Sequence, residues 1–164
     1  MVKHRIMFVC HGNICRSPMA ECIAKHILSG LGLLGEYTVE SSATSRDELY
    51  NPIYPPAKRE LYRRGIVAPQ RKAQQLSAND YEKYDLFALM DRRNMNNILR
   101  IFPSDPNNKI SLLMSYAGES GDVSDPWYTG DFATAYEDIL RGVSALLISL
   151  DERITKEKID SLGL

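Results

Sequence analysis

Short apolar runs recur along the chain and are separated by longer segments. Residues 6–10 and 86–90 are continuously apolar, and residues 37–41 alternate with β-branched side chains. Runs of this length and type are typical of strands, and continuous ones indicate strands that are buried on both faces of a sheet. A weaker run at residues 110–114 predicts one more strand.

Two longer segments carry apolar residues at the spacing of a helix face. One begins at Pro18 and ends near Gly30, and the other covers residues 132–150. We expect Ser17 to cap the first helix and Pro18 to take its first position. Gly30 then marks its end.

Shorter helices are predicted between these segments. One covers residues 57–64 and stops at Gly65, after a loop at residues 45–56 that contains several prolines. Another follows residues 86–90, with Asp91 as its N-cap, and extends to residue 101. Strands that alternate with helices predict an α/β fold, with a parallel sheet and helices on both faces.

Length and composition favour one domain over residues 1–164. The chain is 44% hydrophobic, enough for one core, and its net charge is −1 with no basic run of the kind that binds nucleic acid. No apolar run approaches the ~20 residues needed to cross a membrane, and the first residues do not resemble a signal peptide. We therefore expect a cytoplasmic protein that binds neither nucleic acid nor a membrane.

The cysteines argue for chemistry and against a structural role. All three, Cys10, Cys15 and Cys22, lie within the first 22 residues, so they cannot cross-link the fold. Their spacing to the histidines lacks the paired short intervals of a zinc site, and no metal or other cofactor is expected.

The segment at residues 10–17, CHGNICRS, places a thiol and a guanidinium at the two ends of a loop between a strand and a helix. Such a loop can point successive backbone N–H groups at a phosphoryl group, and Gly12 and Asn13 tolerate left-handed backbone angles. Arg16 adds a planar fork that binds two phosphoryl oxygens. Arg16 and the helix end favour the thiolate form of Cys10, and the Ser17 hydroxyl can stabilise it. We expect Cys10 to attack phosphorus and form a phosphocysteine.

An oxygen leaving group needs a proton, and Asp125 is the candidate donor. It precedes Pro126 in a stiff turn, and Trp127 and Tyr128 beside it can shield it from water. The same carboxylate can then activate water in a second step. We expect Tyr128 to line the cleft and Trp127 to pack beneath it.

The pattern of residues 9–21, VCHGNICRSPMAE, with a distant Asp125-Pro126, resembles the low-molecular-weight protein tyrosine phosphatases over essentially the whole chain. The resemblance implies a single three-layer αβα domain with a four-stranded parallel sheet, the flavodoxin-like or phosphotyrosine phosphatase I-like fold. It implies hydrolysis of phosphotyrosine in protein substrates without a metal, with a phosphate or other oxyanion bound in the loop.

The resemblance also assigns roles. It implies that Cys10 is the nucleophile, Arg16 the phosphate clamp and Asp125 the general acid, and that Asn13, Ser17 and Ser41 support the loop. Cys15 lies where the family has a second loop cysteine that can form a reversible disulfide with the nucleophile. The substrate-binding residues are then expected to be His11 through its backbone N–H, Gly12, Asn13, Ile14, Cys15, Ser17, Asp47, Tyr50, Trp127 and Tyr128.

Two positions depart from the family pattern. Arg46, Asp47 and Glu48 lie where many relatives carry an aromatic wall. An acidic wall should disfavour dianionic or acidic peptide substrates unless Tyr50 or Tyr54 replaces the aromatic residue. A histidine that supports the loop in many relatives has Arg71 as its nearest match here.

Other interpretations of these residues exist. Cys10 can be a buried thiol at the end of a strand, Cys15 a small residue under the loop, Asp125 a turn former, and Trp127 and Tyr128 core aromatics. Arsenate reductases share the fold and the loop but need further cysteines, and none follows Cys22. A phosphotyrosine-binding module without activity would have no use for a proton donor at Asp125.

Overall fold

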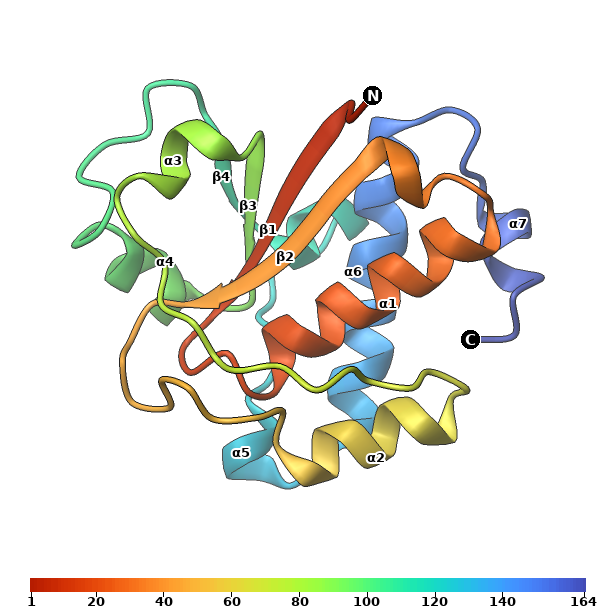
Figure 1. The fold of residues 1–164 in the computed structure, drawn as a ribbon, viewed down its shortest axis with the longest axis horizontal. Helices are drawn as coiled ribbons and strands as arrows, with labels where there is room; N and C mark the ends of the chain where they lie inside the picture. Colours follow the sequence, from red (N-terminus) through yellow and green to blue (C-terminus); the bar gives the residue numbers. More distant parts are fainter.

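The computed structural model describes residues 1–164 and contains one parallel sheet (Figure 1). Its strands are β1 (His4–Cys10), β2 (Tyr37–Ala43), β3 (Leu86–Leu89) and β4 (Ile110–Leu112), in the order β2-β1-β3-β4. All neighbouring pairs are parallel. The predicted fold class, an αβα domain around a four-stranded parallel sheet, is confirmed.

Helices connect the strands and cover both faces of the sheet. They are α1 (Arg16–Gly30), α2 (Pro55–Arg63), α3 (Asp80–Lys83), α4 (Arg92–Ile98), α5 (Pro126–Thr129), α6 (Phe132–Leu150) and α7 (Lys156–Asp160), with short 3₁₀ turns η1 (Leu34–Glu36) and η2 (Leu113–Ala117). The long C-terminal helix has the predicted bounds, because its apolar face is continuous and the Asp131 side chain caps its first turn.

The alternation of side chains along β1 divides the core into two parts. Ile6 and Phe8 point to one face, where α1 and α6 pack on the sheet. Met7 and Val9 point to the other face, where they join Phe87 and residues from the α3 and α4 segments. Successive side chains of a strand point to opposite faces of the sheet. Because both faces are covered here, every residue from Ile6 to Cys10 is buried.

Three helices differ in their bounds from the sequence prediction. Helix α2 spans Pro55–Arg63 where residues 57–64 were expected, because its two prolines fit the first helical turn. The first helix begins at Arg16, and Cys15 takes the N-cap position that was expected for Ser17. Ser17 lies inside the first turn. Its hydroxyl is 2.9 Å from the Cys10 sulfur, so it does not cap a backbone N–H of the helix. Helix α4 ends at Ile98, three residues before the predicted end, and turns follow it.

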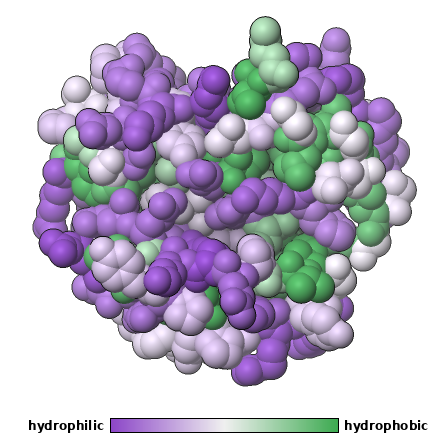
Figure 2. All heavy atoms as spheres, in the orientation of Figure 1, coloured by the Kyte–Doolittle hydropathy of each residue, from purple (hydrophilic) through white to green (hydrophobic).

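The surface of the face seen in Figure 1 is mostly hydrophilic, with apolar residues in separate patches between polar ones (Figure 2). No helix combines the length and the apolar character that a membrane span requires.

Candidate active site

The carboxyl ends of the strands converge on the loop that follows β1. Cys10 is the last residue of β1, and residues 11–15 connect it to α1. The loop encloses a cavity of about 150 Å³. The cavity is lined by Cys10, His11, Gly12, Ile14, Cys15, Arg16, Asp47, Glu48, Asp125, Trp127 and Tyr128.

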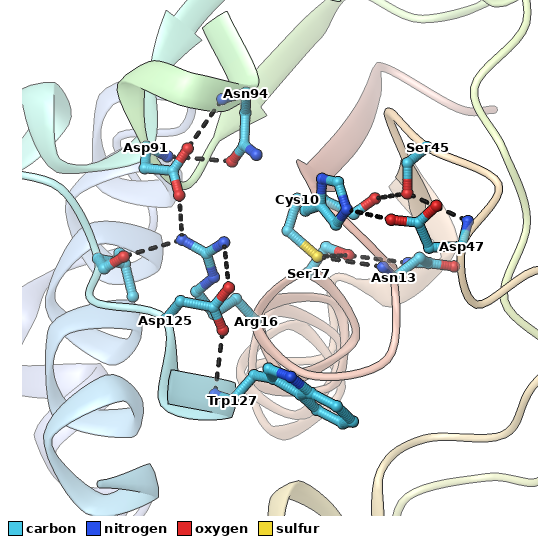
Figure 3. Close-up of polar contacts among 12 residues, drawn as sticks. Cys10, Asn13, Arg16, Ser17, Ser45, Asp47, Asp91, Asn94, Asp125 and Trp127 are labelled. Carbon is cyan, nitrogen blue, oxygen red and sulfur yellow. Dashed lines mark hydrogen bonds and ion pairs between the residues drawn. The ribbon is translucent and has the colours of Figure 1, made fainter. Parts of the chain in front are cut away.

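The Cys10 thiol is held by donors from the loop and from the first turn of α1 (Figure 3). The backbone N–H of Asn13 donates to Sγ over 3.3 Å, and Ser17 Oγ lies 2.9 Å from Sγ. A sulfur that accepts hydrogen bonds at a helix N-terminus is stabilised as the thiolate. The local geometry therefore suits a nucleophile.

Asn13 holds the loop from beneath and does not line the cavity. Its φ of 59° is left-handed, which asparagine tolerates better than most residues. The fully buried side chain donates through Nδ2 to Ser17 Oγ at 2.8 Å and to Ser41 Oγ at 2.9 Å. Ser41 in turn donates to Glu21 Oε1 at 2.6 Å. The structure thus brings Asn13, Ser17 and Ser41 into one network.

Arg71 adds a cation to this network. Its Nη1 donates to the Asn13 backbone carbonyl over 2.7 Å, and Nη2 donates to Asn13 Oδ1 and, over 3.3 Å, to Ser41 Oγ. Burial lowers the pKa of Arg71, while the carboxylate of Glu21 opposes that shift. Arg71, the nearest match to the histidine expected from the family resemblance, therefore contacts the loop directly.

Arg16 lies at the other side of the cavity, with its guanidinium between two carboxylates (Figure 3). Nη1 donates to Asp91 Oδ2 at 2.6 Å and to the Val123 carbonyl at 2.9 Å, and Nη2 lies 3.3 Å from Asp125 Oδ2. Burial lowers the pKa of Arg16, but the charges of Cys10, Asp91 and Asp125 outweigh it and leave the pKa above its ordinary value. Arg16 therefore stays a cation inside the fold.

Asp91 is a site residue that the sequence analysis treated only as a helix cap. It does cap α4, since the Asn94 N–H donates to its Oδ1 at 2.8 Å, and its Oδ2 remains free for Arg16. The sequence does carry a signal for this second role of Asp91. A carboxylate directly after a buried strand lies at the same sheet edge as the loop after β1.

Asp125 lies at the N-terminus of the short helix α5. Its Oδ1 accepts from the Trp127 N–H at 3.1 Å and Oδ2 faces Arg16, while 26% of the side chain stays exposed. The carboxyl group therefore borders both the Arg16 guanidinium and the open part of the cavity. A proton donor needs that position.

The rim of the cavity, formed by His11, Asp47, Glu48, Trp127 and Tyr128, differs from the prediction in three places. Tyr50 does not line this cavity; its φ of 71° directs it into the wall of a separate cavity. Trp127 does not pack beneath Tyr128, since it is 50% exposed and its ring lies 4.8 Å from that of Tyr54. His11, expected to act only through its backbone, pairs through Nε2 with Asp47 Oδ2 at 2.7 Å.

Gly12 contributes a close approach to the rim. A Cβ at this position would lie 3.2 Å from Glu48 Cγ, and its φ is not positive. The glycine thus lets the acidic rim reach the loop, which differs from the left-handed backbone role expected for it. Glu48 also accepts from the Asn51 side chain at 2.6 Å, so it is fixed beside the cavity.

The three cysteines are free and buried. Burial and the neighbouring Cys10 raise the pKa of Cys15 well above its usual range, and burial raises the pKa of Cys22 to about 11. No group of three or more His, Cys, Asp or Glu residues is placed to hold a metal ion.

The site is thus a loop between a strand and a helix at the carboxyl edge of a parallel α/β sheet, with a cysteine and an arginine lining one cavity. The model of the low molecular weight phosphotyrosine protein phosphatase family matches residues 5–159, and the chain belongs to this family. It is therefore an enzyme of the phosphatase class.

Individual relatives agree with that assignment. The chain is 33% identical over 149 residues to the low molecular weight protein-tyrosine-phosphatase YfkJ of Bacillus subtilis, covering 90% of this chain and 96% of the relative. The crystal structure of YfkJ superposes with a TM-score of 0.88 at 31% identity, covering 94% of this chain and 99% of that one. The Streptococcus pyogenes phosphatase structure gives 0.82 at 33% identity, covering 96% and 98%. A Drosophila arginine phosphatase gives 0.79 at 28% identity, covering 89% and 97%.

Proposed function

We propose that the protein hydrolyses phosphotyrosine in protein substrates through a phosphocysteine on Cys10. The observation that carries the proposal is the arrangement around one cavity. It holds a thiol stabilised by Asn13 and Ser17, a buried arginine cation and a carboxyl group in contact with that cation.

The first step transfers the phosphoryl group to sulfur. The Cys10 thiolate attacks phosphorus, the S–P bond forms and the P–O bond to the tyrosyl oxygen breaks. Backbone N–H groups of the loop and Arg16 neutralise the three phosphoryl oxygens. The phosphoryl group competes with Asp125 for Arg16 Nη2, which frees the carboxyl group to give its proton to the departing oxygen.

The second step releases phosphate. The Asp125 carboxylate accepts a proton from a water molecule, which attacks phosphorus opposite the sulfur. The S–P bond breaks and Cys10 leaves as the thiolate, which the Ser17 hydroxyl at 2.9 Å stabilises again. Phosphate is the product, and the enzyme returns to its starting state.

We further propose that the protein acts in the cytoplasm. A nucleophile that must stay reduced suits the cytoplasm, where glutathione keeps thiols free. Cys15 is the second loop thiol, and we propose that it condenses with a Cys10 sulfenic acid formed by peroxide, giving a disulfide and water. The raised pKa of Cys15 makes that condensation slow.

Two other candidate functions have less support. An arsenate reductase needs a relay of cysteines beyond the loop, and no cysteine follows Cys22. A module that only binds phosphotyrosine needs no carboxyl group at the position of Asp125, which touches the phosphate-binding arginine.

The acidic rim favours one second candidate substrate, phosphoarginine. Asp47 and Glu48 line the cavity and can accept hydrogen bonds from a guanidinium next to the phosphoryl group. The Drosophila relative shows that an arginine phosphatase shares this fold. Peptides of one sequence that carry either phosphotyrosine or phosphoarginine, compared by kcat/KM, decide between the substrates.

Turnover of p-nitrophenyl phosphate tests the proposal itself. Wild type should hydrolyse it, and Cys10→Ser should not. Wild-type turnover equal to that of Cys10→Ser would sink the proposal. Arg59→Ser, an exposed position outside the cavity, serves as the control that must keep full activity.

A further inference from the structure

A second cavity of about 410 Å³ lies beside the catalytic loop, outside the site described above. Its wall combines the segment before α2, the first turns of α2 and the loop that carries Arg71. It is lined by Tyr50, Pro52, Ile53, Lys58, Pro69, Gln70, Arg71 and Lys72. We call it the cationic cavity.

The cationic cavity has charges of one sign. Lys58, Arg71 and Lys72 line it, and no Asp or Glu does. None of these three cations forms an ion pair, although thirteen ion pairs occur elsewhere in the molecule. Because the whole chain has a net charge of −1, this is a local concentration of positive charge.

Arg71 is the least exposed member of the group, with a half-buried side chain. Its guanidinium donates only to neutral oxygens, those of Asn13 and Ser41. The carboxylate that acts on it most, Glu21, already binds Lys25 at 2.6 Å and Ser41. A partly desolvated cation without a contacting anion is held at a cost, and an anion in the cavity would offset part of that cost.

We propose that the cationic cavity binds a multiply charged phosphate anion. Two exposed lysines, with three N–H donors each, and the positive charge of Arg71 match a chain of phosphoryl groups, while the Arg71 fork stays on Asn13 and Ser41. The Tyr50 ring, 70% exposed, and the adjacent Pro52 and Ile53 offer an apolar surface for an organic group attached to the phosphates. Free polyphosphate and a nucleoside polyphosphate share this chemistry.

The site is connected to catalysis through one side chain. Arg71 lines the cationic cavity and also holds Asn13, whose backbone N–H donates to Cys10 Sγ. An anion that binds Arg71 therefore acts on the residue that positions the nucleophile. Binding at this site is a means to regulate the phosphatase.

Calorimetric titration with inorganic tripolyphosphate at low salt tests the proposal without depending on activity. The variant is Lys58→Glu with Lys72→Glu. The matched control is Arg59→Glu with Lys83→Glu, which changes the net charge equally at exposed residues outside the cationic cavity. All four side chains are exposed, so both variants should fold, and both should keep wild-type turnover of p-nitrophenyl phosphate without tripolyphosphate.

We expect the Lys58/Lys72 variant to bind tripolyphosphate at this site roughly tenfold more weakly or worse, because two attractive charges become repulsive. The control should bind as wild type does. Equal binding in the two variants would overturn the proposal, whether both bind or both fail to bind. Any binding in the catalytic loop is common to both variants, so the result does not depend on the proposed catalysis.

A parallel titration with ATP identifies the source of the phosphates. Tighter binding of ATP than of tripolyphosphate, lost in Tyr50→Ser, indicates a nucleotide. Equal binding of the two indicates the phosphate chain alone.

Discussion

Arg16 Nη2 lies 3.3 Å from Asp125 Oδ2, so the proposed phosphate clamp and the proposed proton donor are in direct contact. The second guanidinium nitrogen, Nη1, is held by Asp91 at 2.6 Å. One arginine therefore connects two carboxylates with different tasks. Asp91 holds one side of the guanidinium, and in the proposed mechanism Asp125 shares the other side with the entering phosphoryl group.

Asp125→Ala should lower kcat in a way that depends on the leaving group. The loss should be about 10²–10⁴-fold for phosphotyrosine, because tyrosine has a pKa of ~10 and needs the proton. It should be much smaller for p-nitrophenyl phosphate, whose leaving group is stable as an anion. Steady-state kinetics over a series of aryl phosphates measures the dependence. An equal loss for every member would remove Asp125 from the acid role.

Asp91→Asn should weaken the phosphate clamp while the helix cap is kept, since asparagine caps helices as well as aspartate does. Arg16 is 3% exposed, and loss of its buried partner should cost up to about 3 kcal/mol of unfolding free energy. The KM for p-nitrophenyl phosphate should rise because the guanidinium loses its orientation. Urea unfolding and steady-state kinetics measure both effects.

Asp131→Asn is the matched control for this variant. It makes the same substitution at the N-cap of α6, where the side chain accepts from the Thr134 N–H and forms no ion pair. An Asp91→Asn protein with unchanged KM and stability would show that the ion pair does not hold Arg16 in place.

Alkylation should select one thiol. Burial raises the pKa of Cys15 above its usual range and that of Cys22 to about 11, so both remain protonated and slow to react at pH 7. Cys10, held by Asn13 and Ser17, should react first. Mass spectrometry after brief treatment with iodoacetamide should find one adduct, on Cys10. An adduct of the same yield in Cys10→Ser would refute the selectivity.

The loop could be predicted from sequence because its residues are contiguous. Cys10 and Arg16 are separated by a fixed short interval between a strand and a helix, and both line the cavity. The strands and α6 were predictable from periodicity for the same local reason. The short helices α3, α5 and α7 have only four or five residues each, too few to show a period.

The partners of the loop were harder to predict because they depend on packing between distant segments. Asp91 reaches Arg16 across 75 positions of sequence, and Arg71 reaches Asn13 across 58. The sequence predicts Tyr50 in the cleft as a replacement for the family's aromatic wall, but its side chain lines a separate cavity. Trp127 was placed beneath Tyr128, but contact with Tyr54 keeps it at the rim.

The rim should select against acidic peptides. Replacing Asp47 and Glu48 together by Asn and Gln removes two negative charges that line the cavity, without changing side-chain size. For a phosphotyrosine peptide with acidic flanks, kcat/KM should rise about two- to fivefold per charge removed, and for one with basic flanks it should fall. Phosphopeptide profiling of the variant and of Asp47→Trp measures this. Parallel changes for both peptides would contradict a charge effect.

The phosphocysteine is the central claim, and rapid quenching with ³²P-labelled phosphotyrosine peptide tests it most directly. Wild type, and more so Asp125→Ala if the second step is slowed, should carry label on the peptide that contains Cys10, and Cys10→Ser should carry none. Label on another residue would contradict the account. So would turnover by wild type with no label on either wild type or Asp125→Ala.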